Sequence, residues 1–229
     1  MNLHEGHRQR LKERFIKNGL ADFEEHNILE LLLFYAVPRN DTNELGHRLL
    51  KTFGSISNVF DAPIEALCKV EGVGIHTATL IKLIPQICNI YNIDKAENIK
   101  IINTPADAGA YFIPRFMGKM EEEVHVLLLD DKKKLIQSEM ISKGTISAAA
   151  LSIRKIVDAV LRNNATSVVV AHNHPAGVAI PSTQDITVTR KIYIALKSMD
   201  IKLLDHIIVA GDDFVSMQES GNFADFDLY

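Results

Sequence analysis

The sequence has few cysteines, no long apolar run and no excess of positive charge, and each shortage excludes a class of protein. Cys68 and Cys88 are the only cysteines among 229 residues, too few for the disulfide framework of a secreted scaffold. The longest apolar stretch, residues 28–37, is shorter than the roughly 18 residues of a membrane span and contains Glu30. The first residues lack the apolar core of a signal peptide. We therefore expect a soluble, cytoplasmic protein without a membrane partner.

The charge balance excludes a basic nucleic-acid coat. There are 25 basic and 29 acidic residues, a net charge of −4, so any DNA contact has to come from a local patch. Apolar residues make up 47% of the chain, which is enough apolar material to offset the entropy of ordering a globular fold.

The pattern of the chain changes near residue 95. Before that point the apolar spacing is helical, at residues 4–18, 26–37, 41–53, 63 onward and 75–91. After it, short β-branched runs typical of strands alternate with helical patterns, with strands expected at 124–129, 168–171 and 202–210 and helices at 151–162 and 182–199. This alternation favours an α/β layer. We predict a helical domain at 1–95, a linker at 96–105 and an α/β domain at 106–229.

The densest group of potential metal ligands lies between residues 168 and 185. His172 and His174 are two residues apart at the end of an expected strand, so their side chains should share one face. Asp185 falls in the first turn of a helix that Ser182 opens, where a carboxylate can reach back to the two imidazoles. Two histidines and one carboxylate leave one position for water, as in a catalytic zinc site. We predict one Zn²⁺ per chain.

Simpler explanations exist for both halves of this pattern. A His-x-His pair is by itself a weak metal signal, because histidine has many other uses. Ser182 and Asp185 also have the spacing of a capping box, which needs no chemistry. The combination of the two halves is far more specific than either one.

The same residues carry a resemblance to a known family. His-x-His-Pro followed by Ser182 and Asp185 resembles the JAMM signature of MPN-domain metalloproteases. With Pro181 and the later Leu204-Asp205-His206, it more narrowly resembles the bacterial RadC family, over nearly the whole chain. That resemblance implies an N-terminal all-α helix-hairpin-helix domain, followed by a JAMM/MPN domain with a cytidine-deaminase-like α/β fold and a mixed sheet.

The resemblance also implies roles for single residues. The two histidines and the aspartate become the zinc ligands, and Ser182 helps to stabilise the oxyanion. A glutamate on an earlier strand is the general base, and counting back from the Leu-Asp at the end of that strand gives Glu122. Glu121 and Glu123 remain open as one-residue alternatives, and Glu139 is less favoured. Without the metal motif, these glutamates would be a solvated charge run.

Asp205 and His206 are left out of the ligand set. This pair has two possible roles: a hydrogen bond to a zinc ligand, or a purely structural role at the start of a strand.

A second motif lies in the helical half. Val70 to Ala78, with Gly72 and Gly74, resembles a helix-hairpin-helix element, whose glycines let the backbone approach a phosphate. Close helix packing is the alternative use of the glycines. Glu71 is unfavourable for phosphate, and His76 stands where lysine would serve better. The best basic surface carries Arg8, Arg10, Lys12, Arg14 and Lys17.

Two functional hypotheses follow. The first is a zinc-dependent hydrolase of the JAMM type that cleaves a peptide or isopeptide bond in an unidentified protein or peptide. The second is a non-catalytic accessory protein of DNA repair or recombination, with a structural metal site and DNA bound through the N-terminal domain. Both hold together if that domain delivers the hydrolase to its target.

Overall fold

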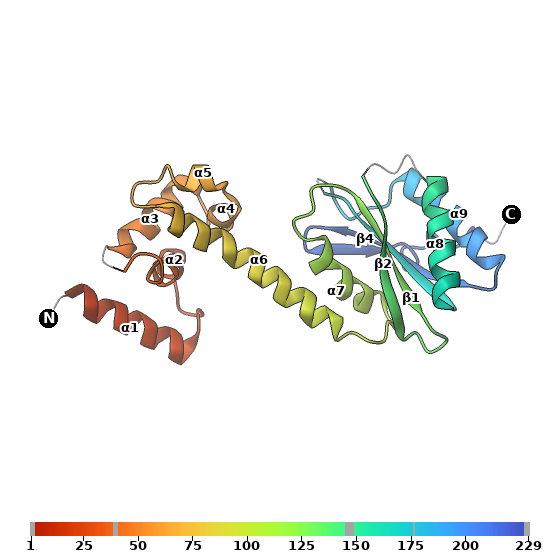
Figure 1. Ribbon diagram of the computed structural model, residues 1–229, viewed down its shortest axis with the longest axis horizontal. Helices are drawn as coiled ribbons and strands as arrows, with labels where there is room; N and C mark the ends of the chain where they lie inside the picture. The colour runs from red at the N-terminus through yellow and green to blue at the C-terminus, as the bar shows by residue number, and fades with distance from the viewer. Residues whose placement is uncertain (1–2, 39–40, 145–148, 176, 227–229) are drawn as a thin grey trace. The chain divides into compact units, whose positions relative to one another are not determined.

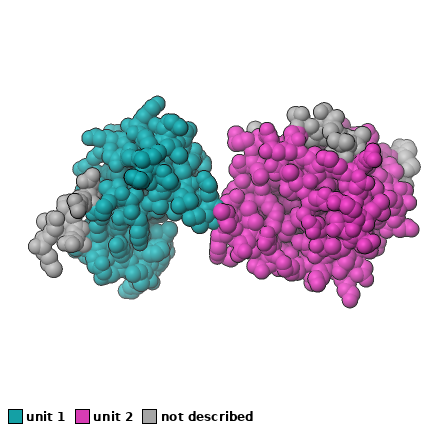
Figure 2. Space-filling view, in the orientation of Figure 1, with its two compact units in different colours: residues 1–88 teal, residues 89–229 magenta. Residues whose placement is uncertain are grey.

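The computed structural model of the chain describes residues 3–38, 41–144, 149–175 and 177–226. It contains two compact units, residues 1–88 and 89–229 (Figure 2). The division falls inside helix α6 (Ile75–Glu97), whereas the sequence pattern put the first domain at 1–95 and a linker at 96–105. α6 continues six residues beyond the expected end at Tyr91, so only residues 98–104 separate it from α7.

The first unit is helical, as expected from the sequence. Its helices are α1 (Leu3–Asn18), α2 (Glu25–Leu33), α3 (Thr42–Phe53), α4 (Ile56–Asp61), α5 (Ile64–Leu67) and the first half of α6. Buried leucines of α2, α3 and α5 form its core around Ile81 of α6. Among the described residues, no helix is both long and apolar enough to span a membrane.

The second unit is built on a five-stranded sheet in the order β2-β1-β3-β4-β5. The strands are β1 (Glu123–Leu129), β2 (Leu135–Lys143), β3 (Ser167–Asn173), β4 (Lys202–Ala210) and β5 (Asp213–Ser216). Only the β3–β4 pair is parallel; β1 pairs antiparallel with both β2 and β3, and β5 with β4. The sheet is therefore mixed. The expected fold, an all-α first part followed by an α/β (α+β) domain with a mixed sheet, is confirmed.

Helices cover both faces of this sheet (Figure 1). On one face α8 (Ala149–Asn163) and α9 (Thr183–Lys197) pack on Val126 and Val170. On the other face α7 (Pro105–Phe116) packs on Leu127 and Val169. Successive strand residues alternate between these faces, so a residue's position in the strand decides which helices its side chain meets.

Candidate metal centre

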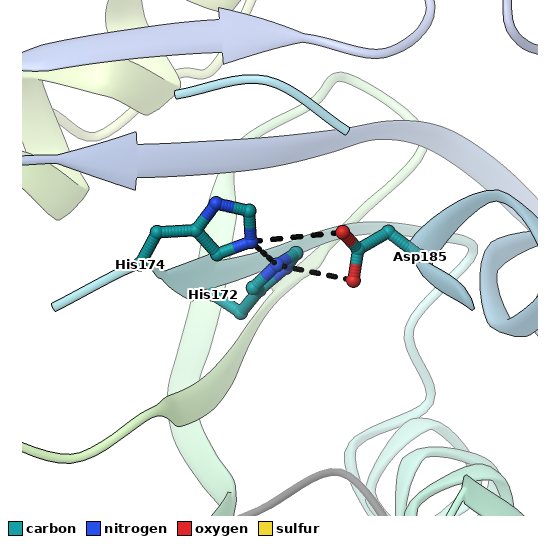
Figure 3. Close-up of side chains that lie close together, drawn as sticks. All are labelled: His172, His174 and Asp185. Carbon is teal, nitrogen blue, oxygen red and sulfur yellow. Dashed lines mark hydrogen bonds and ion pairs between the residues drawn. The ribbon is translucent and has the colours of Figure 1, made fainter. Parts of the chain in front are cut away.

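Three potential ligands meet at the end of β3, on the α8/α9 face of the sheet (Figure 3). Nε2 of His172 lies 2.9 Å from Nε2 of His174 and 3.3 Å from Oδ1 of Asp185. Nε2 of His174 lies 3.6 Å from Oδ2 of the same carboxylate. His172 is the penultimate residue of β3, and His174 is the first residue after the strand. Asp185 lies in the first turn of α9.

The donor set fits a zinc ion. A tetrahedral ion with bonds of about 2.0–2.1 Å keeps its ligand atoms about 3.3 Å apart. The three separations of 2.9, 3.3 and 3.6 Å bracket that value. Two imidazoles and one carboxylate also suit zinc chemically, and the set leaves a fourth position for water or substrate.

His174 is held in a metal-binding tautomer by its own loop. Its Nδ1 lies 3.0 Å from the carbonyl oxygen of Val178. A carbonyl only accepts, so Nδ1 carries the hydrogen and donates it, and the lone pair is left on Nε2. That lone pair points at the other two ligands.

Ser182 holds the third ligand in place. Its hydroxyl donates to Oδ2 of Asp185 at 2.6 Å, and its backbone N–H donates to the same oxygen at 2.8 Å. The Asp185 N–H in turn donates to the Ser182 hydroxyl, so the capping box weighed from the sequence is present. Oδ1 is left facing His172. Because the one hydroxyl hydrogen is donated to Asp185, Ser182 must turn away from that carboxylate before it can donate to an oxyanion.

Burial keeps two histidines here, His172 and His206, in the neutral form. It lowers the pKa of His172 from 6.5 to about 4, although the nearby Asp185 opposes the shift. Burial also lowers the pKa of His206, which is behind His172, well below its usual value. Neutral imidazoles are the form that binds metal.

A pH dependence of stability follows for the metal-free protein. Unfolded His172 takes up a proton near its ordinary pKa of 6.5, whereas folded His172 does not until its pKa of about 4. The unfolded state therefore binds more protons in this window, so the free energy of unfolding should fall as pH drops from 6.5 toward 4. Melting temperatures of chelator-treated protein across this range test the prediction, and a flat profile would contradict it.

Glu122 lies beside the ligands. Together with His174, Ser182 and Asp185 it lines a cavity of about 810 Å³. The strand register explains its side: Val124 is paired with His172 and packs with the α8/α9 cluster, and Glu122 precedes Val124 by two residues. The proposed general base thus lies on the same face as the three potential metal ligands.

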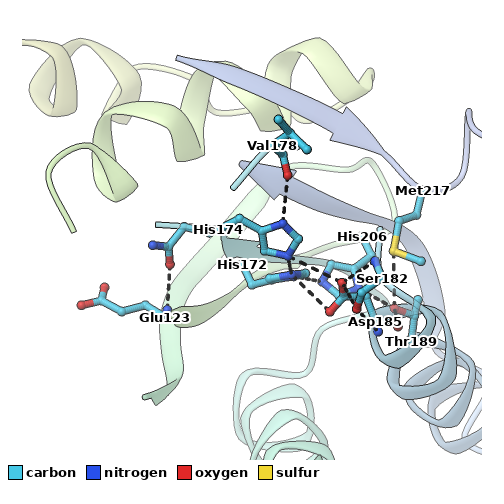
Figure 4. A network of polar contacts seen from close by, with 10 residues as sticks. Glu123, His172, His174, Val178, Ser182, Asp185, Thr189, His206 and Met217 are labelled. Atoms are coloured by element: carbon cyan, nitrogen blue, oxygen red, sulfur yellow. Dashed lines mark hydrogen bonds and ion pairs between the residues drawn. The ribbon is translucent and has the colours of Figure 1, made fainter. Parts of the chain in front are cut away.

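The other three candidate glutamates are in different surroundings. Glu123 lies on the opposite face, where its carboxylate is bonded to His125 and Lys119 and points away from the two site histidines in Figure 4. Burial by itself would raise the pKa of Glu123, but these partners outweigh it and hold the pKa below its usual value. Glu121 also lines the cavity but is exposed and pairs with Lys143. Glu139 lies on the edge strand β2, where it pairs with Arg162 of α8, and it does not line the cavity.

Asn173 is a site residue that the sequence analysis passed over. Its buried side-chain amide accepts from the N–H of Glu123 at 2.7 Å and donates to the carbonyl of Glu121 at 3.1 Å. These two bonds bracket the backbone of Glu122. The available signal was its place between two histidines. Because strand residues alternate in direction and the two histidines share one face, Asn173 must point to the other face.

The DNA candidates lie in the first unit, at the turn between α5 and α6. Gly72 has a φ of +91°, a conformation that favours glycine, as the helix-hairpin-helix resemblance requires. A Cβ at Gly74 would meet no atom within 4 Å, so close packing does not explain that glycine. His76 is exposed in the first turn of α6. DNA contact by these residues stays a prediction.

The basic face of α1 is largely used within the first unit. Arg8 donates to the carbonyls of Val37 and Pro38 and lies over the ring of Phe34. Two other cations of the same helix lie over the rings of Tyr35 and Phe23, namely Lys12 and Arg14. This charge run therefore has a structural explanation.

Comparison with known proteins agrees with this architecture. Residues 102–222, more than half of the chain, match the family described as RadC-like JAB domain. The chain belongs to the RadC family. Residues 4–79 match the family described as UPF0758 N-terminal. The family expected from the sequence is thereby confirmed.

Curated relatives align along almost their whole length. UPF0758 protein FN0909 of Fusobacterium nucleatum subsp. nucleatum is 34% identical over 224 residues, covering 95% of this chain and 97% of the relative. UPF0758 protein PSHAa2643 of Pseudoalteromonas translucida is 34% identical over 213 residues, covering 93% and 95%. UPF0758 protein SPO0054 of Ruegeria pomeroyi is 32% identical over 215 residues, covering 94% and 96%. None of these names states a reaction, so the activity has to be argued from the site.

Proposed function

We propose that this RadC-family protein is a zinc-dependent hydrolase of the JAMM type that cleaves a peptide or isopeptide bond. The observation that carries the proposal is the convergence of His172, His174 and Asp185 beside a cavity that Glu122 also lines. A structural zinc site is normally closed by four protein ligands, whereas three ligands next to an open cavity leave room for water and substrate. The JAB-domain family supports the same assignment.

Each residue of the site has a defined task in this reaction. His172, His174 and Asp185 would hold a zinc ion, which when bound would supply the Lewis acidity that activates water and the scissile carbonyl. The Glu122 carboxylate accepts the proton that the attacking water loses, and later delivers it to the departing amine nitrogen. Ser182 keeps Asp185 oriented, and if its hydroxyl turns toward the substrate it donates to the developing oxyanion. Water thus adds across the C–N bond, giving a carboxylate and an amine.

Cleavage of a peptide library by the zinc-loaded full-length chain tests the proposal. New amino termini are identified by mass spectrometry, with lysine-linked isopeptides included in the library. We expect cleavage that a chelator stops and added zinc restores, with about one zinc per chain. A protein that binds one zinc but cleaves nothing in the library would contradict the hydrolase and favour the accessory function. A protein that takes up no zinc would contradict both.

A further inference from the structure

A chain of buried hydrogen bonds leads from His172 away from the ligand cluster into α9 (Figure 4). Nδ1 of His172 lies 2.8 Å from Nε2 of His206, and Nδ1 of His206 lies 2.5 Å from Oγ1 of Thr189. The Thr189 hydroxyl also lies 2.6 Å from the main-chain carbonyl of Asp185. An imidazole nitrogen donates or accepts depending on the tautomer, so the partners at the far end decide the direction of the whole chain.

The Asp185 carbonyl sets that direction. The Thr189 hydroxyl has one hydrogen, and the carbonyl only accepts, so both short contacts are hydrogen bonds only if Thr189 donates to the carbonyl and accepts from His206. Nδ1 of His206 then carries the hydrogen, and its Nε2 accepts from Nδ1 of His172. Nε2 of His172 is left with a lone pair directed at the ligand cluster, which is the form that binds a metal.

The opposite direction leaves a poor contact. Thr189 would donate to His206, and its oxygen would face the Asp185 carbonyl across 2.6 Å with no hydrogen between them. In the favoured direction the lone pairs of His172 and His174 face each other across 2.9 Å, and a shared cation turns that repulsion into attraction. A bound cation is thus the condition under which all of these contacts are favourable.

We propose that His206 and Thr189 are positioning residues that fix His172 in its zinc-binding tautomer. This inference rests on the proposed zinc site. It also links two ligands, because Thr189 connects the ring of His172 to the backbone of Asp185. Hydrogen bonds of this kind to metal-bound histidines set the tautomer and orientation of the ring.

A bulge in β4 brings His206 to the correct face. Leu203 is paired with Val168 on the α8/α9 face, but Val169 is paired with Asp205, so one extra residue, Leu204, is inserted. By simple alternation from Leu203, position 205 would face the metal and position 206 would face α7. The extra residue reverses this order, so His206 is paired with Val170 and shares the face of His172.

Asp205 anchors the bulge on the other face of the sheet. Its buried carboxylate accepts from the N–H groups of His206 and Gln218 and from the hydroxyl of Ser216. These hydrogen bonds connect the bulge to β5 and to the segment that follows β5. The Asp205-His206 pair therefore divides two tasks between the faces of one strand: the aspartate holds the backbone and the histidine contacts the zinc ligand.

Thr189→Val and Thr189→Ser form the matched pair that tests this inference. Valine has the shape of threonine without the hydroxyl, so His206 loses the acceptor that keeps its hydrogen on Nδ1. We expect zinc affinity to fall about 10–100-fold in Thr189→Val, the usual cost of losing such a contact, and to stay within about threefold in Thr189→Ser. Competition with a chelating dye at fixed pH measures the affinity of the full-length chain.

The second readout is the tautomer itself. Long-range ¹H–¹⁵N spectra of the zinc-free protein distinguish the protonated from the unprotonated ring nitrogen of His172. We expect the population with hydrogen on Nδ1 to be larger in the wild type than in Thr189→Val, a change that a general loss of stability does not produce. An unchanged tautomer together with unchanged affinity in Thr189→Val would overturn the inference.

Substitution of His206 gives an independent check. In His206→Gln the amide oxygen can accept from His172 and the NH₂ can donate to Thr189, so this variant should retain most zinc affinity, while His206→Leu should lose it. Equal affinity of the two variants would contradict positioning by hydrogen bonds. A wild type that binds no zinc would refute the proposed function, but the tautomer measurement would still decide whether the chain runs as proposed.

Discussion

Replacing His174 with alanine is expected to reduce bound zinc from about one ion per chain to a trace. The substitution removes one of three protein ligands, so the loss of affinity should exceed the roughly 10–100-fold that loss of an outer hydrogen bond costs. His174 is the best ligand to remove, since its side chain is 18% exposed and follows the strand, whereas that of His172 is 2% exposed within the sheet. Metal analysis after dialysis against zinc-free buffer measures the effect.

The control for this variant is another histidine. His76 is exposed, lies in the first unit and has the same side-chain chemistry, so His76→Ala should keep the wild-type zinc content. It corrects for zinc that binds adventitiously to surface histidines. Equal zinc in wild type and His174→Ala would reject the metal centre, and with it the hydrolase.

Local patterns were sufficient to predict the ligand cluster. The spacing of His172 and His174 predicts a shared face once a strand is assumed, and the three consecutive valines at 168–170 indicate that strand. The position of Asp185 follows from the N-cap, because a residue three places after Ser182 must lie in the first helical turn. These relations lie within fourteen residues of chain, so no knowledge of the tertiary fold was needed.

Elements with a mixed pattern were missed. β2 is an edge strand in which Gln137 is exposed and Ser138 half-buried, so it lacks the apolar run by which the other strands were recognised. α7 begins with Pro105 at its first position and contains Gly109 and Pro114, which as sequence signals indicate a loop. Gly109 is needed for packing, since a Cβ there would lie 2.6 Å from the ring of Phe214.

The place of His206 could not be derived from sequence spacing. Alternation along β4 places His206 on the wrong face. The bulge that moves it to the other face depends on hydrogen bonds from Ser216 at the end of β5 and from Gln218 after it to Asp205. Such contacts are tertiary. For the same reason the sheet face on which each of Glu121, Glu122 and Glu123 lies could not be assigned until the pairing of β1 with β3 supplied the register.

The general base gives the second large effect. Glu122→Gln should keep about one zinc per chain but lose hydrolysis by a factor of about 10²–10⁴, the usual contribution of general acid–base catalysis. Glutamine has nearly the same shape as glutamate but cannot take up the proton of the attacking water. Initial rates on a peptide that the wild type cleaves, measured at matched zinc content, test this expectation.

The two neighbouring glutamates provide matched controls in the same three-residue run. Glu121→Gln removes an exposed partner of Lys143, and Glu123→Gln removes a buried partner of Lys119 and His125 on the opposite face of the sheet. By strand alternation, neither residue lies on the sheet face of His172, so both variants should retain hydrolysis. Glu123→Gln should nevertheless melt at a lower temperature, because a buried ion pair is broken. Full activity in Glu122→Gln with a large loss in Glu121→Gln would move the base by one residue, since Glu121 also lines the cavity. Full activity in all three would mean that the proton is taken by another group.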